Sequence, residues 1–494
     1  MRNPKKVIFL FSLLVHVLFW VSLGTGMINP LFNDSSHRIG KGGDFFQFYQ
    51  AGADVVSGCS IYRTENKKLV IPYGALYKYP PLLGCTVGVI SQTVSPWSAY
   101  RIWLVIIGCA FVVMLFLLKK IVFACDFLPI LSFSLVSTPY YLDLYHGQTN
   151  TVMAMLISMI MYGFLKKKNL LTMIPLAVSM NIKLMTVFLI PIYLSEKKWK
   201  NLSIALVVSI GLFLPYFLFF KNDLAFFLKY VFGGAVDYFY QAGNFGVYPL
   251  LKDIISIFTY DKNIVLYTHI SWIVGVMAVS IVVHIYSKKR DPVDMILLWL
   301  TTFFLVFKFV WEHHFVMLIP VLAVEYSRNN KKSVGFLWLL FAVPTAFYFF
   351  DINLGSGYTE VQPYWSDSIS LFYHCSKILP VFVLYTLIIL RLFDRKVSFF
   401  KTLIGYFLLV VFFLAICILK PVSARDYHVM ARQALRVGKK TVAKKCFEKS
   451  IQTNPRYADV YVDYIRFLYK IGDIKKARAM AQRAGTVSDN KIFK

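Results

Sequence analysis

Residues 97–118 read WSAYRIWLVIIGCAFVVMLFLL, and the dilysine Lys119-Lys120 follows at once. Arg101 is the one charged side chain in this run. About 20 consecutive apolar residues suffice for a helix to cross the hydrocarbon core of a bilayer. The stretch therefore predicts a membrane-spanning helix, and the positive-inside rule puts its dilysine end in the cytoplasm.

The composition of the whole chain extends this prediction. Of the 494 residues, 58% are hydrophobic and only 16% are charged, and the mean hydropathy is +0.60. Soluble domains carry about 25% charged residues. One or two soluble cores cannot hide so much apolar surface, and disordered, coiled-coil, collagen and disulfide-rich classes are excluded as well. The seven cysteines show no paired spacing, which favours buried free thiols.

Basic clusters separate the apolar runs and define a topology. The first run, from Val7 to about Ile28, is too long for a signal peptide and lacks a cleavage site, so it predicts a signal-anchor helix. With basic clusters inside, residues 29–96 form a long external loop, in which 80–94 either dips into the membrane or spans it. The run 170–195 is basic at both ends and predicts a broken or hairpin segment. We expect an all-α polytopic membrane protein with about 11–13 spans, built on runs at 7–28, 97–118, 122–141, 149–165, 170–195, 201–220, 264–286, 293–310, 314–327, 333–351, 371–391 and 402–419.

The net charge of +28 does not indicate a nucleic-acid-binding protein, because most basic residues lie in short clusters between apolar runs. The exception is the C-terminal tail, residues 421–494, which has 17 Lys+Arg, 6 Asp+Glu and a net charge of +11. We predict a membrane domain over residues 1–420 and a separate tail domain. The tail's charge suits anionic lipid headgroups or an acidic glycan, or it is a solvated scaffold face.

The tail repeats at an interval of 34 residues and resembles tetratricopeptide repeats. Small residues would let paired helices approach, an aromatic residue would pack each pair, and a proline would stop the first unit. About two units are present, fewer than the usual minimum of three, so the tail is expected to lean on the membrane domain. The repeat rests on the pairs Gly438/Gly472, Ala443/Ala477 and Tyr427/Tyr461, with Asn454-Pro455 closing the first unit.

The external loop contains the acidic residue of greatest interest. Asp44 follows two glycines and precedes Phe45, Phe48, Tyr49 and Gly52, whose helical spacing predicts an amphipathic helix in the membrane interface. Asp44 either caps this helix or acts as a general base.

Other polar residues lie at helix ends on the same predicted side of the membrane. They are His146, Gln148, Asn150, Asn244 in the turn 241–248, and the pair His313-His314. Lys183 lies inside an apolar run, where an ionisable group is a functional candidate unless it snorkels or pairs internally. Tyr73, Tyr77 and Tyr79 precede Pro80-Pro81 and predict an aromatic belt or a sugar-stacking wall. The sequence has no Asp-x-Asp, zinc-ligand spacing or phosphate-binding Gly-rich loop, which disfavours a nucleotide-sugar donor, a metal and other cofactors.

Over roughly residues 1–350, these motifs resemble the polyprenyl-phosphate-mannose-type glycosyltransferases of family 87. The resemblance rests on the order and spacing of short motifs: Gly-Gly-Asp44-Phe with Tyr49 and Gly52, Gly58 with Ile61-Tyr62, Tyr79-Pro80-Pro81, Gly147-Gln148-Thr149-Asn150, Ile182-Lys183 and Trp311-Glu-His313-His314.

The resemblance implies a GT-C fold, a polyprenyl-phosphate sugar donor and an active site at the external face of the plasma (inner) membrane. Asp44 would deprotonate a lipid or glycan hydroxyl that attacks the anomeric carbon of a mannose-like hexose or a pentose, with inversion. The leaving phosphate would meet His313, His314, Lys183 and Arg101. His146, Gln148 and Asn150 would read sugar hydroxyls, or Asn150 would only cap a helix, and Tyr49, Tyr79 and Asn244 would form an acceptor or aromatic wall.

Two other classes of function stay open at this stage. A transporter or flippase of lipid-linked sugars would use Lys183 as a charged element inside the membrane. It would also predict an internal repeat of the membrane portion, which the sequence does not show. A non-catalytic assembly scaffold would use the repeat-like tail.

Overall fold

The computed structural model describes residues 4–32, 40–62, 68–72, 77–123, 125–232, 244–258, 262–287, 291–345, 366–395 and 398–487. Within these ranges the regular elements are helices, and one isolated β-bridge joins Asn244 to Trp311. Tyr73 and residues 241–243 of the predicted turn 241–248 lie outside them.

Six helices in the described ranges are long and apolar enough to cross a membrane: α1 (Pro4–Thr25), α6 (Pro96–Ile121), α12 (Trp199–Phe219), α15 (Lys262–Tyr286), α19 (Asp367–Leu392) and α20 (Phe399–Leu419). Shorter apolar helices cover Pro81–Ser91, Asn150–Leu165, Asn169–Ile182, Leu184–Ser195 and Pro292–Val306. The prediction of an all-α, multi-pass membrane protein is confirmed. The total of 11–13 spans stays a prediction.

The remaining helices surround these spans or connect them. In the first half of the chain they are α2 (Asn29–Phe32), α3 (Phe45–Val56), α4 (Pro81–Leu83), η1 (Gly84–Gly88), α5 (Val89–Ser91), α7 (Phe127–Leu135), α8 (Thr138–His146), α9 (Asn150–Leu165), α10 (Asn169–Ile182), η2 (Leu184–Leu189) and α11 (Ile190–Ser195). In the second half they are α13 (Lys221–Phe226), η3 (Phe227–Phe232), α14 (Val247–Ser256), α16 (Pro292–Val306), η4 (Glu312–Leu318), α17 (Ile319–Arg328), α18 (Lys331–Ala342), α21 (Ala424–Arg436), α22 (Lys440–Thr453), α23 (Ala458–Lys470) and α24 (Ile474–Val487).

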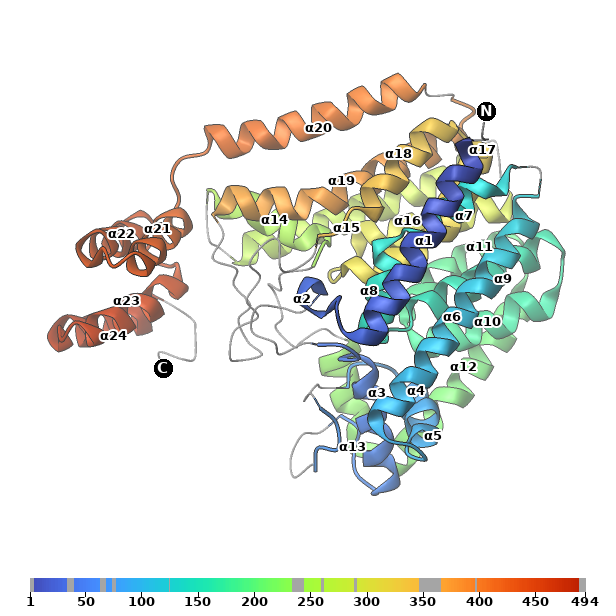
Figure 1. Ribbon diagram of the computed structural model, residues 1–494, viewed down its shortest axis with the longest axis horizontal. Helices are drawn as coiled ribbons and strands as arrows, with labels where there is room; N and C mark the ends of the chain where they lie inside the picture. Colours follow the sequence, from blue (N-terminus) through green and yellow to red (C-terminus); the bar gives the residue numbers. More distant parts are fainter. Residues whose placement is uncertain are drawn as a thin grey trace.

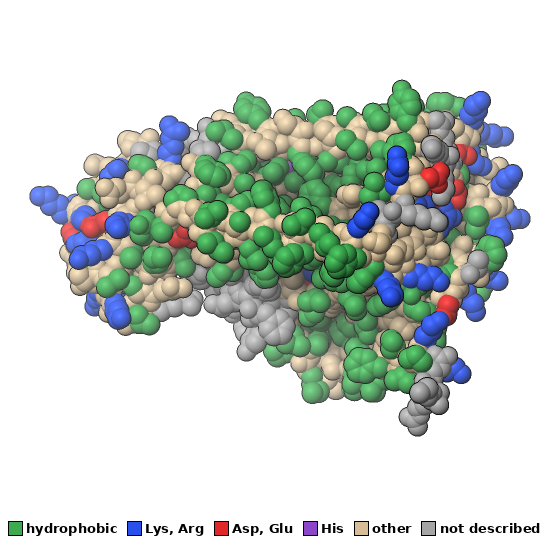
Figure 2. Space-filling model, turned by 90° about the horizontal axis from the view of Figure 1, so that it is seen from above, with side chains coloured by type: hydrophobic (Ala, Val, Ile, Leu, Met, Phe, Trp, Pro, Cys, Tyr) green, Lys and Arg blue, Asp and Glu red, His purple; other side chains and the backbone are tan. Residues whose placement is uncertain are grey.

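The surface of the molecule separates apolar from charged side chains. Figure 2 shows hydrophobic side chains spread over the middle of the long axis, with Lys and Arg gathered mostly toward its two ends. Large apolar side chains are exposed on the spans themselves, including Phe11 on α1 (64%) and Phe407 on α20 (62%). An exposed apolar band of this kind is expected where helices face lipid tails rather than water.

Two predicted runs are interrupted, each for a local reason. The run 122–141 was expected to be one span, but it begins just after α6 ends and contains all of α7 and the start of α8. Pro139, in the first turn of α8, lacks the N–H that would continue α7. The run 170–195 breaks as predicted, and the break is at Lys183, whose extended backbone (φ −147°, ψ 131°) separates α10 from η2.

The predicted loop helix exists as α3, and most of its residues are buried within the protein. Its position in the membrane interface stays a prediction. The helix packs against the 81–91 segment so closely that a Cβ on Gly52 would lie 2.0 Å from the carbonyl carbon of Gly88. Phe45, Phe46 and Phe48 of α3 are fully buried. The 81–91 segment is too short to cross a bilayer alone, which agrees with a segment that dips.

The C-terminal tail forms its own hydrophobic cluster from α21 to α24, at the left of Figure 1. The repeat-related residues Ala443 and Ala477 are both fully buried in it. Gly438 and Gly472, also 34 residues apart, both have positive φ angles (76° and 82°) where one helix ends and the next begins. Two similar helical hairpins are therefore present, and their assignment as tetratricopeptide repeats stays a prediction.

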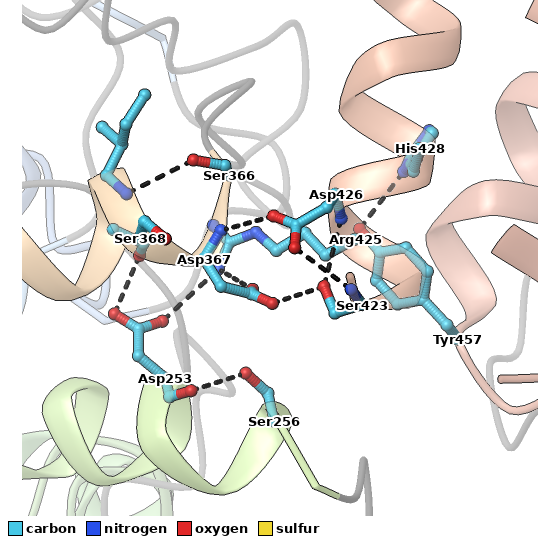
Figure 3. A network of polar contacts seen from close by, with 12 residues as sticks. Asp253, Ser256, Ser366, Asp367, Ser368, Ser423, Arg425, Asp426, His428 and Tyr457 are labelled. Carbon is cyan, nitrogen blue, oxygen red and sulfur yellow. Dashed lines mark hydrogen bonds and ion pairs between the residues drawn. The ribbon is translucent and has the colours of Figure 1, made fainter. Parts of the chain in front are cut away.

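A buried ionic network joins the tail to the membrane domain (Figure 3). We call it the Arg425 cluster: Asp253 of α14, Asp367, Ser370 and His374 of α19, and Lys420, Ser423, Arg425 and Asp426 around the start of α21. Arg425 lies 3.4 Å from both Asp253 and Asp367, and His374 Nδ1 lies 2.6 Å from Asp253. Lys420 pairs with Asp426. Each buried carboxylate in this cluster thus has a cationic partner.

Candidate active site

The loop before α3 is docked against the end of α8 by backbone hydrogen bonds. The N–H of Gly42 donates to the Tyr145 carbonyl (2.7 Å), and the N–H of Asp44 donates to the His146 carbonyl (3.0 Å). Gly147, which ends α8, has a φ of +69° and lies so close to α3 that an added Cβ would be 2.6 Å from the Cβ of Phe45. This docking places Asp44 beside His146.

The side chain of Asp44 does not cap α3, although its position predicted a cap. Asp44 is the N-cap residue of α3, yet its carboxylate makes no capping hydrogen bond. Its Oδ1 accepts a hydrogen bond from Gln47 Nε2 (2.9 Å), and the residue is half-buried. Asp44 lies within electrostatic range of His146, Lys183 and Tyr79. The structure therefore does not show the capping role, and the general-base role stays a prediction.

Lys183 extends from the break between α10 and η2 toward the start of α9. Its Nζ donates to Asn150 Oδ1 (2.5 Å) and to Gln148 Oε1 (3.3 Å). The Tyr79 hydroxyl donates to the same Gln148 oxygen (3.1 Å), and the ammonium lies 5.9 Å from the centre of the Tyr79 ring. The unwound backbone at residue 183 thus delivers a cation to the polar residues that were predicted to share one side.

Three histidines complete the group. The ring of His313 lies 5.8 Å from that of His146 and 4.8 Å from that of His314. His314 Nδ1 accepts a hydrogen bond from the Trp311 N–H (3.2 Å). His146 Nδ1 and His313 Nε2 are buried and have no hydrogen-bond partner within the described part of the chain.

We call these residues the Asp44 cluster: Asp44, Tyr79, His146, Gln148, Asn150, Lys183, His313 and His314. The large majority of buried side-chain polar atoms in proteins are hydrogen-bonded, so open ones need an explanation. A cluster with a carboxylate, a buried ammonium and two open imidazole nitrogens can accept a proton and hold an anion. Both open nitrogens are accounted for if a polar ligand occupies the space between these side chains.

The segment with the histidine pair is fixed from its other side. Glu312 is buried and accepts hydrogen bonds from the Thr345 backbone and hydroxyl. It also pairs with the buried Lys377 of α19 (3.2 Å). Lys377 in turn donates to carbonyls at the end of α18, including that of Phe341 (2.9 Å). Glu312 is therefore a structural residue that orients its neighbours His313 and His314.

Three predicted site residues lie elsewhere or are fully engaged. Arg101 is exposed on α6, and Lys41 is the group it influences electrostatically. The Tyr49 hydroxyl donates to the Val94 carbonyl (2.8 Å) on the far side of α3. Asn244 is buried, and its side chain clamps the backbone of residues 308–310 through the Lys308 carbonyl and the Val310 N–H. Asn244 thus holds the Trp311 segment in place and does not form an open wall.

Two residues of the site were missed by the sequence analysis. Gln47 orients the Asp44 carboxylate, and its position one helical turn after Asp44 was the available signal. Asp143 is fully buried and accepts hydrogen bonds from Asn150 and Thr151. No spacing rule marks Asp143, because it caps α9 from the preceding helix and not from the N-cap position.

One comparison with known sequences agrees with the resemblance described above. Residues 77–308 match the sequence model of glycosyltransferase family 87, which confirms the resemblance over that range. No curated protein matches the sequence. Two crystal structures of ArnT from Cupriavidus metallidurans are similar at 13% identity and a TM-score of 0.38: the apo state, over 83% of this chain and 76% of that one, and the undecaprenyl phosphate complex, over 92% and 80%.

Proposed function

We propose that this chain is an integral membrane glycosyltransferase that moves a sugar from a polyprenyl-phosphate donor to a hydroxyl group of a lipid or glycan acceptor. One observation carries the proposal. Asp44, which does not cap its helix, lies next to His146 and within electrostatic range of the buried Lys183 ammonium, and His146 and His313 each have a buried nitrogen without a partner in the described chain. The match to glycosyltransferase family 87 over residues 77–308 supports the same reaction class.

In this proposal Asp44 is the general base. The Gln47 amide holds Asp44 Oδ1, so that Oδ2 is the oxygen that accepts the proton. The acceptor oxygen then bonds to the anomeric carbon as the bond from that carbon to the phosphate oxygen breaks. Attack from the face opposite the phosphate inverts the configuration. General base catalysis of this kind contributes typically 10²- to 10⁴-fold in rate.

The leaving polyprenyl phosphate needs donors and positive charge. Lys183 supplies an ammonium, and His313 and His314 supply imidazole groups next to it. Prepositioned groups of this type stabilise charge that develops in the transition state. His146, with its open Nδ1, is placed to contact the sugar. The sugar would be a mannose-like hexose or a pentose.

The proposal also includes the setting of the reaction. With basic clusters inside, the Asp44 cluster and the tail lie on the external side of the plasma (inner) membrane. There the membrane domain (1–420) would carry the chemistry, and the basic tail (421–494), as tetratricopeptide-like repeats, would rest against anionic lipid headgroups. A single cysteine at the exposed Met430 (46%) tests this. Labelling of intact cells by an impermeant maleimide is expected, and protection until the cells are lysed would contradict the external assignment.

The central experiment is Asp44→Asn in the full chain. Radiolabelled sugar transfer from polyprenyl-phosphate mannose to membrane lipids should fall by about 10³-fold, with expression and thermal unfolding unchanged because Asp44 supports no helix cap. The matched control is Asp54→Asn on the same helix, whose carboxylate bonds to Gln50 outside the cluster.

Transfer at near the wild-type rate in Asp44→Asn would refute the proposal. Equal losses in Asp44→Asn and Asp54→Asn would also count against it, because they would indicate a general effect on α3. Loss of lipid-linked sugar movement across vesicles, with transfer intact, would favour a flippase.

A further inference from the structure

Asp143 is a buried carboxylate that the proposed reaction leaves without a role. It lies on α8 with no exposed surface. Its Oδ1 accepts hydrogen bonds from the backbone N–H (3.2 Å) and the amide Nδ2 (2.8 Å) of Asn150. Its Oδ2 accepts from the backbone N–H (2.8 Å) and the hydroxyl (2.6 Å) of Thr151. A negative charge at a helix N-terminus is stabilising, so one function of Asp143 is to cap α9.

The hydrogen bond to the Asn150 side chain has a second effect. An amide has a donor end and an acceptor end, and a carboxylate can accept only from the donor end. Because Asp143 holds Nδ2, Asn150 Oδ1 must point the opposite way. That oxygen accepts from Lys183 Nζ at 2.5 Å. The carboxylate therefore sets the orientation of the group that holds the ammonium.

The charge of Asp143 matters as well. Burying an unpaired ammonium is strongly unfavourable. Asp143 lies within electrostatic range of Lys183 and supplies the balancing charge through one intervening amide. Direct pairing would block the ammonium, whereas here one N–H donates to Asn150 and one to Gln148, and the third has no partner in the described part of the chain. Lys183 is thus held in place without a direct ion pair to Asp143.

We propose that Asp143 is a positioning residue that acts through Asn150 to hold the Lys183 ammonium for the phosphate of the donor lipid. The inference rests on the proposed function, because it assigns that phosphate to Lys183. Helix capping alone would give Asp143 no influence on a ligand of Lys183, and this difference can be measured.

The test is a double-mutant cycle on binding, with undecaprenyl phosphate as the probe and the full chain in nanodiscs. Lys183→Met should weaken binding by about 30-fold and Asp143→Asn by about tenfold, as for close charged partners. In the Lys183→Met background, Asp143→Asn should change the affinity by less than about twofold. Thr151→Val removes one capping hydrogen bond and leaves the Asn150 link intact, so it should lower the unfolding temperature but not the affinity.

Asn150→Leu covers the case in which Asp143→Asn fails to fold. It keeps the Thr151 cap and cuts the link to Lys183, and it should reproduce the tenfold loss. Additive effects of Asp143→Asn and Lys183→Met, or full affinity in Asn150→Leu, would overturn the inference and leave the proposed function standing. Absence of undecaprenyl phosphate binding in the wild-type chain would overturn both.

Discussion

The Asp44 cluster and the Arg425 cluster are both buried and polar, yet they differ in how their hydrogen bonds are used. In the Arg425 cluster, Asp253 and Asp367 share Arg425, and His374 pairs with Asp253. In the Asp44 cluster, His146 and His313 each keep a nitrogen without a partner in the described chain. A saturated network holds two parts of a protein together, whereas an unsaturated one leaves room for a ligand. The hydrogen bonding alone thus distinguishes the Arg425 cluster, which attaches the tail, from the Asp44 cluster, which can bind a ligand.

The largest expected effect concerns the saturated cluster. Arg425→Met would leave Asp253 and Asp367 buried with one cation fewer and should cost about 3–5 kcal/mol of stability. The measurement is the thermal unfolding midpoint in detergent, together with the protease sensitivity of the tail. Arg432→Met is the control, since Arg432 pairs with Asp463 at a more exposed site (25% exposed), where about 1 kcal/mol or less is expected. Equal shifts in the two variants would break the comparison.

A matched pair of histidines gives the next largest effect. His374→Phe should destabilise the chain by about 2–3 kcal/mol, because Asp253 loses a buried partner. His313→Phe removes a nitrogen that has no partner in the described chain, so the unfolding midpoint should stay unchanged or rise. Sugar transfer should show the reverse order, with His313→Phe losing about 100-fold. A larger loss of stability in His313→Phe than in His374→Phe would contradict our account of the two clusters.

A third prediction concerns the packing between Gly147 and the loop that carries Asp44. Gly147→Ala combines a left-handed backbone with a Cβ 2.6 Å from that of Phe45, and should cost about 2–3 kcal/mol. Gly58→Ala has a similar φ of +70° but open space around the new methyl group, and should cost about 1 kcal/mol. Unfolding midpoints of the two variants give the steric part by difference. No difference would mean that the loop bearing Asp44 is not packed tightly against Gly147.

The smallest effect is a dependence on pH within the tail. Burial pushes the pKa of Asp463 upward, but the hydrogen bond from His428 and the charge of Arg432 outweigh it and hold the pKa below its ordinary value. A lowered pKa in the folded state adds stability at neutral pH, and this is lost as the pH falls below about 4. The difference in unfolding midpoint between wild type and Asp463→Asn should therefore shrink from pH 7 to pH 3. A constant difference would contradict the pairing.

Much of the fold followed from simple counting of apolar residues and charges. Apolar length identified the spans, and the basic ends of the run 170–195 indicated the break now seen at Lys183. The division of the run 122–141 into α7 and α8 was missed, because a proline in the first turn of a helix does not lower the apolar content of a run. The burial of α3 was also missed, since periodicity does not show that Gly52 meets Gly88.

The members of the Asp44 cluster were largely foreseen from polar residues assigned to one side of the membrane and from the family resemblance. Neither gives distances, so Arg101, Tyr49 and Asn244 were included although the structure places them in other contacts. Asp143 was missed for the opposite reason. Its partners Asn150 and Thr151 belong to the next helix, and only the folded chain brings them to it.

Helix α20 has a consequence for how this chain can vary. Of its 21 residues, only Thr402 is buried. The exposed positions are free to change as long as they remain apolar, whereas half-buried side chains such as Tyr406 and Phe413 pack against the core. The length of the helix is constrained instead: at 1.5 Å per residue it measures about 31 Å, close to the hydrocarbon thickness of about 30 Å. The number of residues in α20 is therefore the property that must be kept. It sets the height, relative to the membrane, at which Lys420 and Arg425 lie and can pair with Asp367 and Asp253.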